Sequence, residues 1–195
     1  LQKEKNNMIR DKQKKIKTGT VIKQDTLESR VNIAYLSIGS NIGDKRSNIE
    51  KTKYLIEENK IKIIKTSSIY ETYSWPNKNH PKFYNIVIKI ITNLNPVELF
   101  GLIKVIEKKL GRKKSKKNAP RICDIDILDF RGSSYNLSIN NSKLLIPHPR
   151  LHKRNFVLFP LFEIEKKWKH PSKKTKIHDL IQNLDNFSLY SIKQI

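Results

Sequence analysis

Two carboxylates, Asp124 and Asp126, stand two residues apart in the run ICDIDIL. In a β-strand this spacing places both side chains on one face, about 6.6 Å apart along the strand. Two carboxylates at this distance repel each other, and Mg²⁺ relieves such repulsion because it binds one or two carboxylates together with the phosphates of a substrate. The pair therefore predicts a magnesium site. The alternative is an exposed strand face that carries two solvated acids.

Cationic residues surround the pair and favour the magnesium interpretation. Arg121 stands three residues before Asp124, after a basic run at 112–117. Cations beside metal-binding carboxylates suit a polyphosphate that is held from both sides. His148 lies between two prolines and is followed by Arg154, so it is a further candidate for phosphate contact, although a turn residue would look the same. The sequence contains neither a Walker-type loop nor a kinase glycine-rich loop, so any phosphoryl transfer uses a different phosphate-binding structure.

The strand that carries these acids is the last element of a regular order. Alternation and capping signals predict strands at 31–38, 61–73, 83–92 and 122–130, and helices at 45–58 and 95–110. The order β-α-β-β-α-β predicts an α+β, ferredoxin-like sandwich, in which helices pack on an antiparallel sheet. Residues 131–195 are expected to add a C-terminal extension with turns, a proline-flanked segment and two helices.

Two local signals support this order most strongly. Val31, Ile33 and Tyr35 alternate with Ala34, Leu36 and Ile38, which predicts a strand that is buried on both faces. The run Asn95-Pro96-Val97-Glu98 places a capping amide, a proline and a capping-box acid at the three positions where a helix start uses them. This run therefore predicts the start of the second helix.

Composition limits the class of protein. The chain has 195 residues, with 40 Lys+Arg against 18 Asp+Glu. We expect one domain at 31–195 and a basic, disordered extension at 1–30, which carries nine basic and four acidic residues. Its single cysteine, Cys123, excludes an intramolecular disulfide and favours a reducing, cytoplasmic location. No apolar run approaches the roughly 20 residues of a membrane span, so no membrane partner is expected.

The net charge of +22 raises the alternative of a nucleic-acid-binding module on the same fold. Part of this charge reflects a composition rich in Lys, Ile and Asn, which A- and T-rich codons encode. An RNA-binding version of the fold would carry an aromatic RNP1-like strand, and the sequence has none. Asp124 and Asp126 would also repel a phosphate backbone unless they were bound to metal. No specific nucleic acid is therefore expected.

Six separated motifs carry a resemblance to the 6-hydroxymethyl-7,8-dihydropterin pyrophosphokinases of folate biosynthesis. They follow in the order of that family and cover about residues 32–170: AYLSIGSNIGDKRSNIE at 34–50, SSIYET at 67–72, FYN at 83–85, IEKKLGR at 106–112, APRICDIDIL at 119–128 and IPHPRLHKRNFVLFPLFEI at 146–164. The resemblance implies transfer of a diphosphate from ATP to the hydroxymethyl oxygen of the dihydropterin, with release of AMP. A chain that keeps the fold but has lost activity remains an alternative.

The resemblance also assigns roles to residues. Asp124 and Asp126 match the ligands of two Mg²⁺ ions, and with Arg112 and Arg121 they form the catalytic set. The nucleotide contacts correspond to Glu107, Arg112, Arg121, Ile127, His148 and Arg154. The pterin contacts correspond to Thr72, Phe83, Asn85, Asp124 and Phe156. The loops at 74–82 and 112–120 are expected to close over ATP. We expect a monomer whose partners are these two small-molecule substrates.

Elementary chemistry agrees with the pterin roles. A flat heteroaromatic ring is stabilised between two aromatic faces, which Phe83 and Phe156 can supply. An amide such as Asn85 can donate and accept hydrogen bonds at once, as the edge of such a ring requires. Ordinary core packing is the alternative for the two phenylalanines. It explains Asn85 less well, because an unpaired amide in a β-branched strand is costly.

Overall fold

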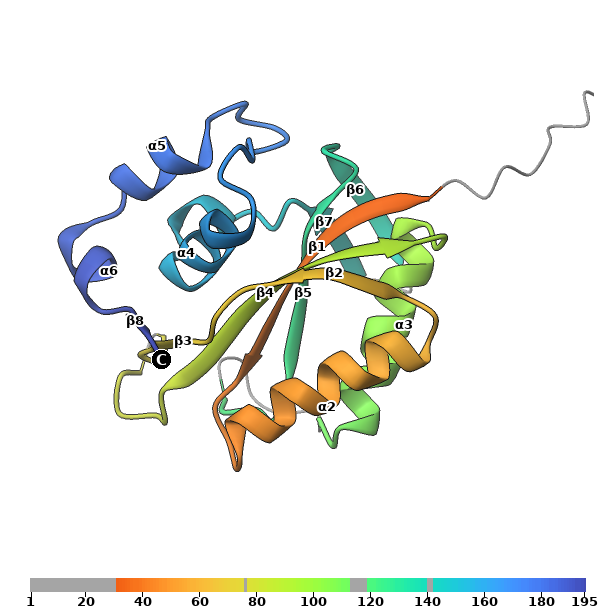
Figure 1. Ribbon diagram of the computed structural model, residues 1–195, viewed down its shortest axis with the longest axis horizontal. Coiled ribbons are helices and arrows are strands. Elements are labelled where there is room, and N and C mark those ends of the chain that lie inside the picture. Colours follow the sequence, from red (N-terminus) through yellow and green to blue (C-terminus); the bar gives the residue numbers. More distant parts are fainter. Residues whose placement is uncertain (1–30, 76, 113–118, 140–141) are drawn as a thin grey trace, which may run out of the picture. The chain divides into compact units, whose positions relative to one another are not determined.

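In the computed structural model, the described part of the chain comprises residues 31–75, 77–112, 119–139 and 142–195. Its first part follows the expected order (Figure 1): β1 (Asn32–Ser40), α2 (Lys45–Glu58), β2 (Lys62–Thr66), β3 (Tyr70–Thr72), β4 (Phe83–Thr92), α3 (Pro96–Lys109) and β5 (Asp124–Phe130). The predicted extension at 1–30 lies outside the described residues, and so do residues 113–117 of the basic run and most of the loop predicted at 112–120.

One antiparallel sheet holds these strands in the order β5-β1-β4-β3-β8, and β2 pairs with β4 beside β3. This order confirms the α+β prediction of an antiparallel sheet with helices packed on it. The single strand predicted at 61–73 is wrong, because the chain leaves the ladder between β2 and β3. At Ser67 the backbone N–H donates to the Val87 carbonyl (2.9 Å), and the hydroxyl accepts from the Val87 N–H (3.0 Å).

The C-terminal part contains more elements than the two predicted helices. A hairpin of β6 (Tyr135–Ile139) and β7 (Ser142–Ile146) is followed by a 3₁₀ turn, Leu151–Lys153, and then by α4 (Asn155–Ile164), α5 (Ile177–Gln182), α6 (Asn186–Tyr190) and β8 (Lys193–Gln194). Their shortness explains the error, because short helices and strands show too few turns or alternations for a periodic signal.

Capping side chains begin both long helices. Asn95 accepts from the backbone N–H groups of Val97 and Glu98, while the Glu98 carboxylate accepts from the Asn95 N–H. This reciprocal pair confirms the predicted capping box. Asp44 begins α2 in the same way, since its carboxylate accepts from the Ser47 N–H at 3.0 Å.

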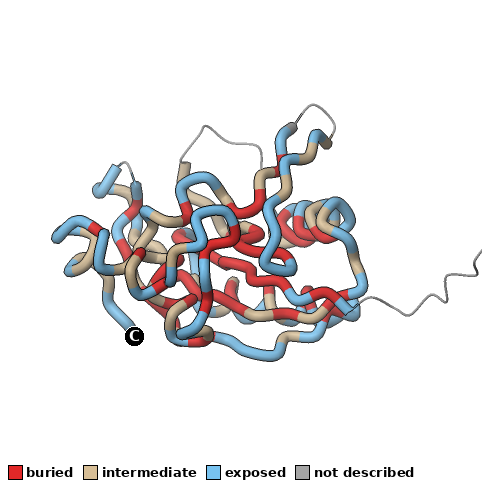
Figure 2. Tube along the Cα trace, turned by 90° about the horizontal axis from the view of Figure 1, so that it is seen from above, coloured by how far each residue is buried: buried red, intermediate tan, exposed pale blue. Residues whose placement is uncertain are grey.

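Two apolar cores lie on opposite faces of the sheet. Ile49 and Ile56 of α2 and Ile103 of α3 pack on one face with Leu36 of β1. The other face is covered by α4 and the chain after it, in a core formed by Tyr35, Val87, Leu128, Leu151, Val157, Leu158, Leu161, Ile164, Trp168, Ile177, Leu180 and Leu184. The sheet is therefore the middle of three layers (Figure 1), and buried segments concentrate along it (Figure 2).

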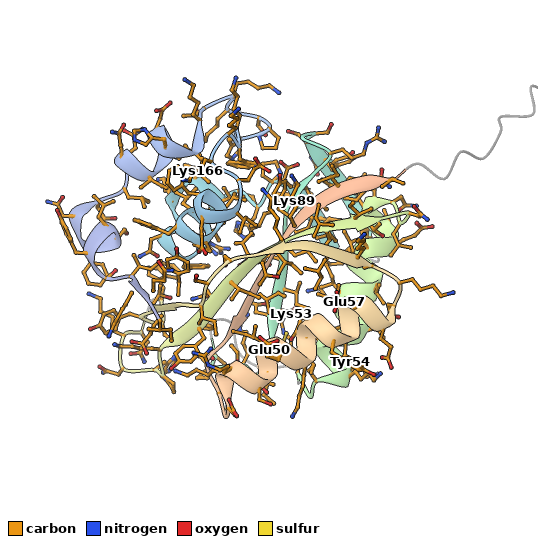
Figure 3. All side chains as sticks on the ribbon, viewed as in Figure 1. Glu50, Lys53, Tyr54, Glu57, Lys89 and Lys166 are labelled. Carbon is orange, nitrogen blue, oxygen red and sulfur yellow. The ribbon has the colours of Figure 1, made fainter. Side chains whose placement is uncertain are left out.

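The outer surfaces complete the fold. Val31 is 58% and Ile33 42% exposed, so the start of β1 is not buried on both faces as predicted. The solvent side of α2 carries Tyr54 and an ion pair between Glu50 and Lys53 (2.7 Å; Figure 3). Among the residues that the structure describes, no helix combines the length and the apolar character that crossing a membrane requires.

Candidate functional site

The two predicted metal ligands begin β5. Asp124 and Asp126 point to one face, with side chains 29% and 37% exposed, while Ile125 between them is 2% exposed. Cys123 and Ile127 are also buried, against the core beneath. The alternation that predicted this strand is therefore confirmed. The carboxylates lie on the opposite side of the sheet from α2 and α3.

Two arginines from different segments bind Asp124. Arg112, just after α3, places Nη1 2.8 Å from Oδ1, and Arg121 places Nη1 3.0 Å from Oδ2. Burial raises the pKa of Asp124, and the negative charge of Asp126 raises it further. The positive charges of Arg121 and Arg112 act in the opposite direction and lower it. Burial also disfavours the charge on Arg112, but Asp124 and Glu107 outweigh it and raise the pKa of Arg112. The site thus concentrates charge of both signs where solvent is scarce.

Asp126 has its own guanidinium partner. Arg154, at the N-terminus of α4, places Nη1 3.2 Å from Oδ2 of Asp126. Burial lowers the pKa of Arg154, and Asp126 opposes that shift. His148 lies nearby, where burial and the charge of Arg154 lower its pKa. Its Nδ1 accepts from the Arg150 N–H at 3.0 Å, which leaves Nε2 as the nitrogen free to face a ligand.

Glu107 lies behind this cluster. Its side chain is 3% exposed and forms ion pairs with Arg112 and with Lys104, the latter at 2.9 Å. It also accepts from the backbone N–H of Ile125 at 2.9 Å. Both carboxylate oxygens therefore have protein partners. This arrangement suits a positioning residue, which fixes Arg112 and the start of β5, better than the direct nucleotide contact that the sequence suggested.

A cavity of about 280 Å³ adjoins Asp126. It extends under Ile127 and His148, two predicted nucleotide contacts, and is lined by Phe100, Lys104, Ile125, Asp126, Ile127, Lys143, Leu144, Leu145, His148 and Pro149. Apolar side chains together with convergent polar groups, here Lys104, Lys143 and His148, are typical of small-molecule sites. The cavity therefore offers room for a small group of mixed polarity next to the carboxylate pair.

On the other side of β1, the predicted pterin residues come together. Asn85 of β4 is 4% exposed and donates from Nδ2 to Thr72 Oγ1 at 2.9 Å. Gly39 of β1 lies opposite Asn85, and a Cβ there would be 2.9 Å from Asn85 Oδ1 and 3.5 Å from Phe83 Cδ1. Glycine at this position therefore keeps the space that Asn85 and Phe83 occupy.

The remaining predicted pterin residue, Phe156, comes from a different layer. It lies in the first turn of α4, with the Arg154 guanidinium 5.4 Å from the centre of its ring. Because α4 packs on β3 and β4, Phe156 belongs to the layer that covers Thr72 and Asn85. Segments far apart in the sequence thus converge on one face of the sheet.

One residue of this region was not predicted to have a role. Asn41 is 2% exposed, and its Oδ1 accepts from the Arg121 N–H at 2.7 Å. Its Nδ2 donates to Ser74 Oγ (3.2 Å) and to the Pro81 carbonyl (3.1 Å). Asn41 therefore joins the arginine side of the site to the β3–β4 connection. Asn41 belongs to the GSN-x-G run at the end of β1, but in the sequence this run indicated only a turn and gave Asn41 no role in the site.

The donor set suits Mg²⁺ shared with a phosphate ligand. Asp124 and Asp126 supply the hard oxygen ligands that Mg²⁺ prefers. Burial and the negative charge of Asp126 raise the pKa of Asp124, and a divalent cation bound to both carboxylates would relieve their repulsion. Within the described ranges, no three His, Cys, Asp or Glu side chains are grouped so that they could hold a metal by themselves. Further ligands must therefore come from substrate oxygens and water.

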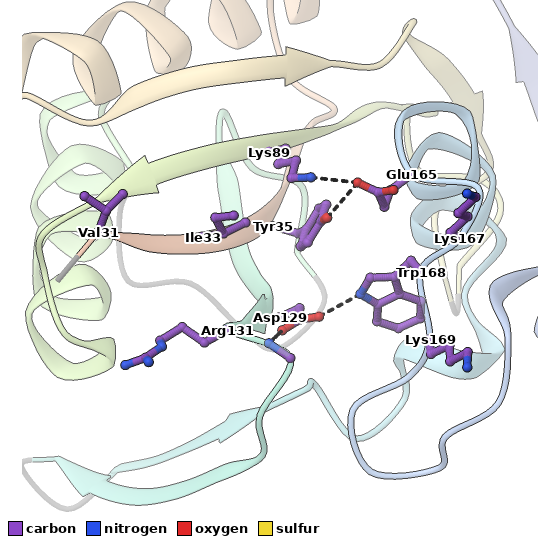
Figure 4. A pocket seen from close by; sticks show the side chains of 11 residues that line it. Val31, Ile33, Tyr35, Lys89, Asp129, Arg131, Glu165, Lys167, Trp168 and Lys169 are labelled. Carbon is purple, nitrogen blue, oxygen red and sulfur yellow. Dashed lines mark hydrogen bonds and ion pairs between the residues drawn. The ribbon is translucent and has the colours of Figure 1, made fainter.

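A larger cavity, of about 510 Å³, lies near the start of β1 and contains none of the predicted site residues (Figure 4). On its wall Glu165 Oε2 accepts from Lys89 Nζ (2.7 Å) and from the Tyr35 hydroxyl (3.0 Å). Burial raises the pKa of Tyr35 to about 12, so this hydroxyl remains a donor. Asp129 accepts from Trp168 Nε1 at 2.7 Å on the same wall. These contacts join α4 and the chain after it to the sheet.

Comparison with known sequences gives a consistent result. Residues 35–166 match the family model described as 7,8-dihydro-6-hydroxymethylpterin-pyrophosphokinase. Two curated relatives are named 2-amino-4-hydroxy-6-hydroxymethyldihydropteridine pyrophosphokinase. The one from Bacillus subtilis is 40% identical over 134 residues, which cover 68% of this chain and 78% of the relative. The one from Aquifex aeolicus is 44% identical over 137 residues, which cover 70% and 82%.

Solved structures show the same fold. The crystal structure of wild-type Plasmodium falciparum HPPK-DHPS with pteroate aligns with a TM-score of 0.66 at 19% sequence identity. The alignment covers 85% of this chain and 46% of that one, so this chain spans about half of its length. At this identity the likeness concerns the fold alone.

Proposed function

This chain belongs to the 7,8-dihydro-6-hydroxymethylpterin-pyrophosphokinase family, and we propose that the residues gathered around Asp124 carry out the reaction of that family. The enzyme is an ATP-dependent diphosphokinase of folate biosynthesis. It transfers a diphosphate from ATP to the hydroxymethyl oxygen of 6-hydroxymethyl-7,8-dihydropterin and releases AMP. The observation that carries the residue assignment is the cluster of Asp124 and Asp126 with Arg112, Arg121 and Arg154.

On the ATP side, the three arginines hold the phosphates. Their guanidiniums contact the two carboxylates and are largely buried, so charge that develops on phosphate oxygens meets fixed donors. The cavity beside Asp126 takes the base or sugar of the nucleotide, with Ile127 offering backbone groups and His148 a ring nitrogen. Glu107 acts through Arg112, because its own oxygens are occupied.

On the pterin side, Asn85 and Thr72 bond to the polar edge of the ring. Their mutual hydrogen bond fixes the amide before substrate arrives. Phe83 and Phe156 supply the two faces between which the ring stacks. The hydroxymethyl oxygen then points along the sheet toward Asp124, and an in-line displacement at phosphorus requires little covalent help from the protein.

Asp124 and Asp126 would hold two Mg²⁺ ions, which when bound neutralise charge on the phosphate oxygens. Arg112 and Arg121 contact Asp124, and Arg154 contacts Asp126, so each carboxylate lies beside a positive charge. No side chain is assigned as general base. We also propose a monomer in a reducing, cytoplasmic compartment, since Cys123 is free and buried.

The decisive experiment measures AMP release from ATP with and without 6-hydroxymethyl-7,8-dihydropterin, in the presence of Mg²⁺ and after addition of EDTA. We expect AMP only when pterin and metal are both present. Turnover that is unchanged by EDTA would contradict the metal assignment. A folded chain that releases no AMP would be a member of the family without its activity, the alternative that the sequence left open.

A further inference from the structure

The last ten residues of the chain lie against both walls of the proposed pterin site. This C-terminal segment, 186–195, comprises α6 and β8 and lies beyond residue 166, where the match to the family ends. None of its residues was predicted to take part in the site. Its contacts reach the β3–β4 connection on one side and the start of α4 on the other.

The first set of contacts is with β3 and the residues that follow it. β8 pairs with β3, where Gln194 lies opposite Tyr70 and Lys193 opposite Glu71. The Ile195 N–H donates to the Ile69 carbonyl at 2.9 Å. β3 ends at Thr72, the predicted pterin contact. The C-terminal strand thus completes the backbone hydrogen bonds on the otherwise open side of β3, which stabilises a strand of only three residues.

The second set is aromatic and involves the β3–β4 connection itself. The ring of Phe187 lies 6.2 Å from that of Tyr73, the residue directly after Thr72. Lys78 Nζ, also on this connection, lies 3.8 Å from the centre of the Phe187 ring. Phe187 is 51% exposed, so this contact covers the connection without belonging to the core. An aromatic pair and a cation–π contact in this setting each contribute a modest amount to stability.

The third set reaches α4. Asn155, the first residue of α4, donates from Nδ2 to the Ser188 carbonyl at 2.7 Å. It stands between Arg154 and Phe156, which are proposed to contact nucleotide and pterin. One short segment, 186–191, therefore touches the residue after Thr72 through Phe187 and the residue before Phe156 through Ser188.

We infer that the C-terminal segment positions the two walls of the pterin site relative to each other, with Phe187 as its main positioning residue. The inference rests on the proposed pterin site. Phe187 is not a catalytic residue, because it acts on Tyr73 and Lys78 rather than on substrate. Loss of its ring loosens the β3–β4 connection directly beside Thr72, so it should weaken pterin binding more than ATP binding, because the connection reaches the arginine side only indirectly, through Asn41.

The test compares Phe187→Ala with Tyr190→Ala in the 195-residue chain. Both residues lie on α6, but Tyr190 is 86% exposed and makes none of these contacts, so it is a matched control. We expect Phe187→Ala to raise the KM for pterin about two- to tenfold, the loss that one aromatic contact predicts, and to leave the KM for ATP within about twofold. Phe187→Tyr, which keeps the ring, should restore the wild-type KM.

A second variant separates positioning from general stability. Lys78→Gln removes the partner on the connection and leaves the C-terminal segment intact, so it should raise the KM for pterin in the same selective way. Equal KM values for Phe187→Ala and Tyr190→Ala, or equal rises for both substrates, would overturn the inference. A wild-type chain without pterin-dependent AMP release would instead overturn the proposed function on which it rests.

Discussion

Each proposed metal ligand already has a cationic partner from the protein. Asp124 contacts Arg112 and Arg121, and Asp126 contacts Arg154. A guanidinium can turn to a phosphate only if another cation takes over the charge of its carboxylate, because an unpaired carboxylate is costly in such partly buried surroundings. Binding of Mg²⁺ and binding of ATP are therefore expected to strengthen each other.

Asp126→Asn tests this site at the level of one charge. The change keeps the shape of the side chain but removes a hard anionic ligand, so we expect turnover to fall by at least about 100-fold, comparable to the loss of one strong electrostatic contact in an active site. The melting temperature should change little, since the side chain is 37% exposed.

Initial rates of AMP release and thermal unfolding measure both effects. Asp179→Asn is the matched control, because Asp179 is a 49% exposed acid on α5, outside the site. An Asp126→Asn enzyme that retains more than a tenth of wild-type turnover would show that this carboxylate is not a metal ligand.

Gly39→Ala tests the pterin side. The added Cβ would meet Asn85 Oδ1 at 2.9 Å, so the amide must move away from its position against Thr72. We expect the KM for pterin to rise about tenfold, the effect of losing one well-placed hydrogen bond. Gly101→Ala in α3 is the control, since a Cβ there meets nothing within 4 Å. Steady-state kinetics should leave the control at wild-type values; a normal KM for Gly39→Ala would argue against the role of Asn85.

At the scale of elements, periodic segments were predictable and short ones were not. The helix that begins at Asn95 could be predicted from its own residues, because its capping signal is local. The break between β2 and β3 depends on Ser67 bonding to Val87, twenty residues away, and the β6–β7 hairpin depends on packing beside β5. Contacts of this kind are set by tertiary structure and leave no periodic trace in the sequence.

The layer that covers the pterin side is joined to the sheet by Glu165, just after α4. The hydrogen bond from Lys89 lowers the pKa of Glu165, so the folded chain binds this proton less readily than the unfolded chain does. The stabilisation is therefore fully present above the ordinary value of 4.5 and is lost as pH falls through the lower folded pKa.

Glu165→Gln should remove this pH-dependent stabilisation of the folded chain. We expect the difference in the free energy of unfolding between wild type and variant to shrink as pH falls from about 6 to about 3. Urea unfolding across this range measures it, and Lys89→Gln should reduce the same pH-dependent component from the other side of the pair. A difference that stays constant with pH would mean that the pair does not contribute to folding.

At the scale of the whole chain, the site could be predicted as a set of residues but not as an arrangement. Motif spacing identified Asp124, Asp126 and the arginines, since neighbours on one strand share a face. The contacts of Arg121 with Asn41 and of Arg112 with Glu107 depend on how α3 and β1 end beside β5. Contacts between such distant segments follow from the order of the strands in the sheet, and no single sequence motif encodes that order.

Removal of residues 1–30 tests the predicted division of the chain. This segment carries nine basic and four acidic residues, and every residue proposed for the site lies beyond it. We expect the shortened chain, 31–195, to keep wild-type KM and kcat values and a melting temperature within about 2 °C, as for changes that leave the core intact. A loss of pterin-dependent AMP release would show that the basic segment contributes to the enzyme itself.

Gly39 also lies between the two halves of the proposed site. It pairs with Asn85 on one side and with Asp124 on the other, so a single strand separates the pterin amide from the metal carboxylate. Neighbouring antiparallel strands lie about 4.5–5.5 Å apart, which sets these two backbone positions roughly 10 Å from each other. A shift of register in β1 is therefore expected to displace the proposed pterin contacts relative to the proposed metal ligands.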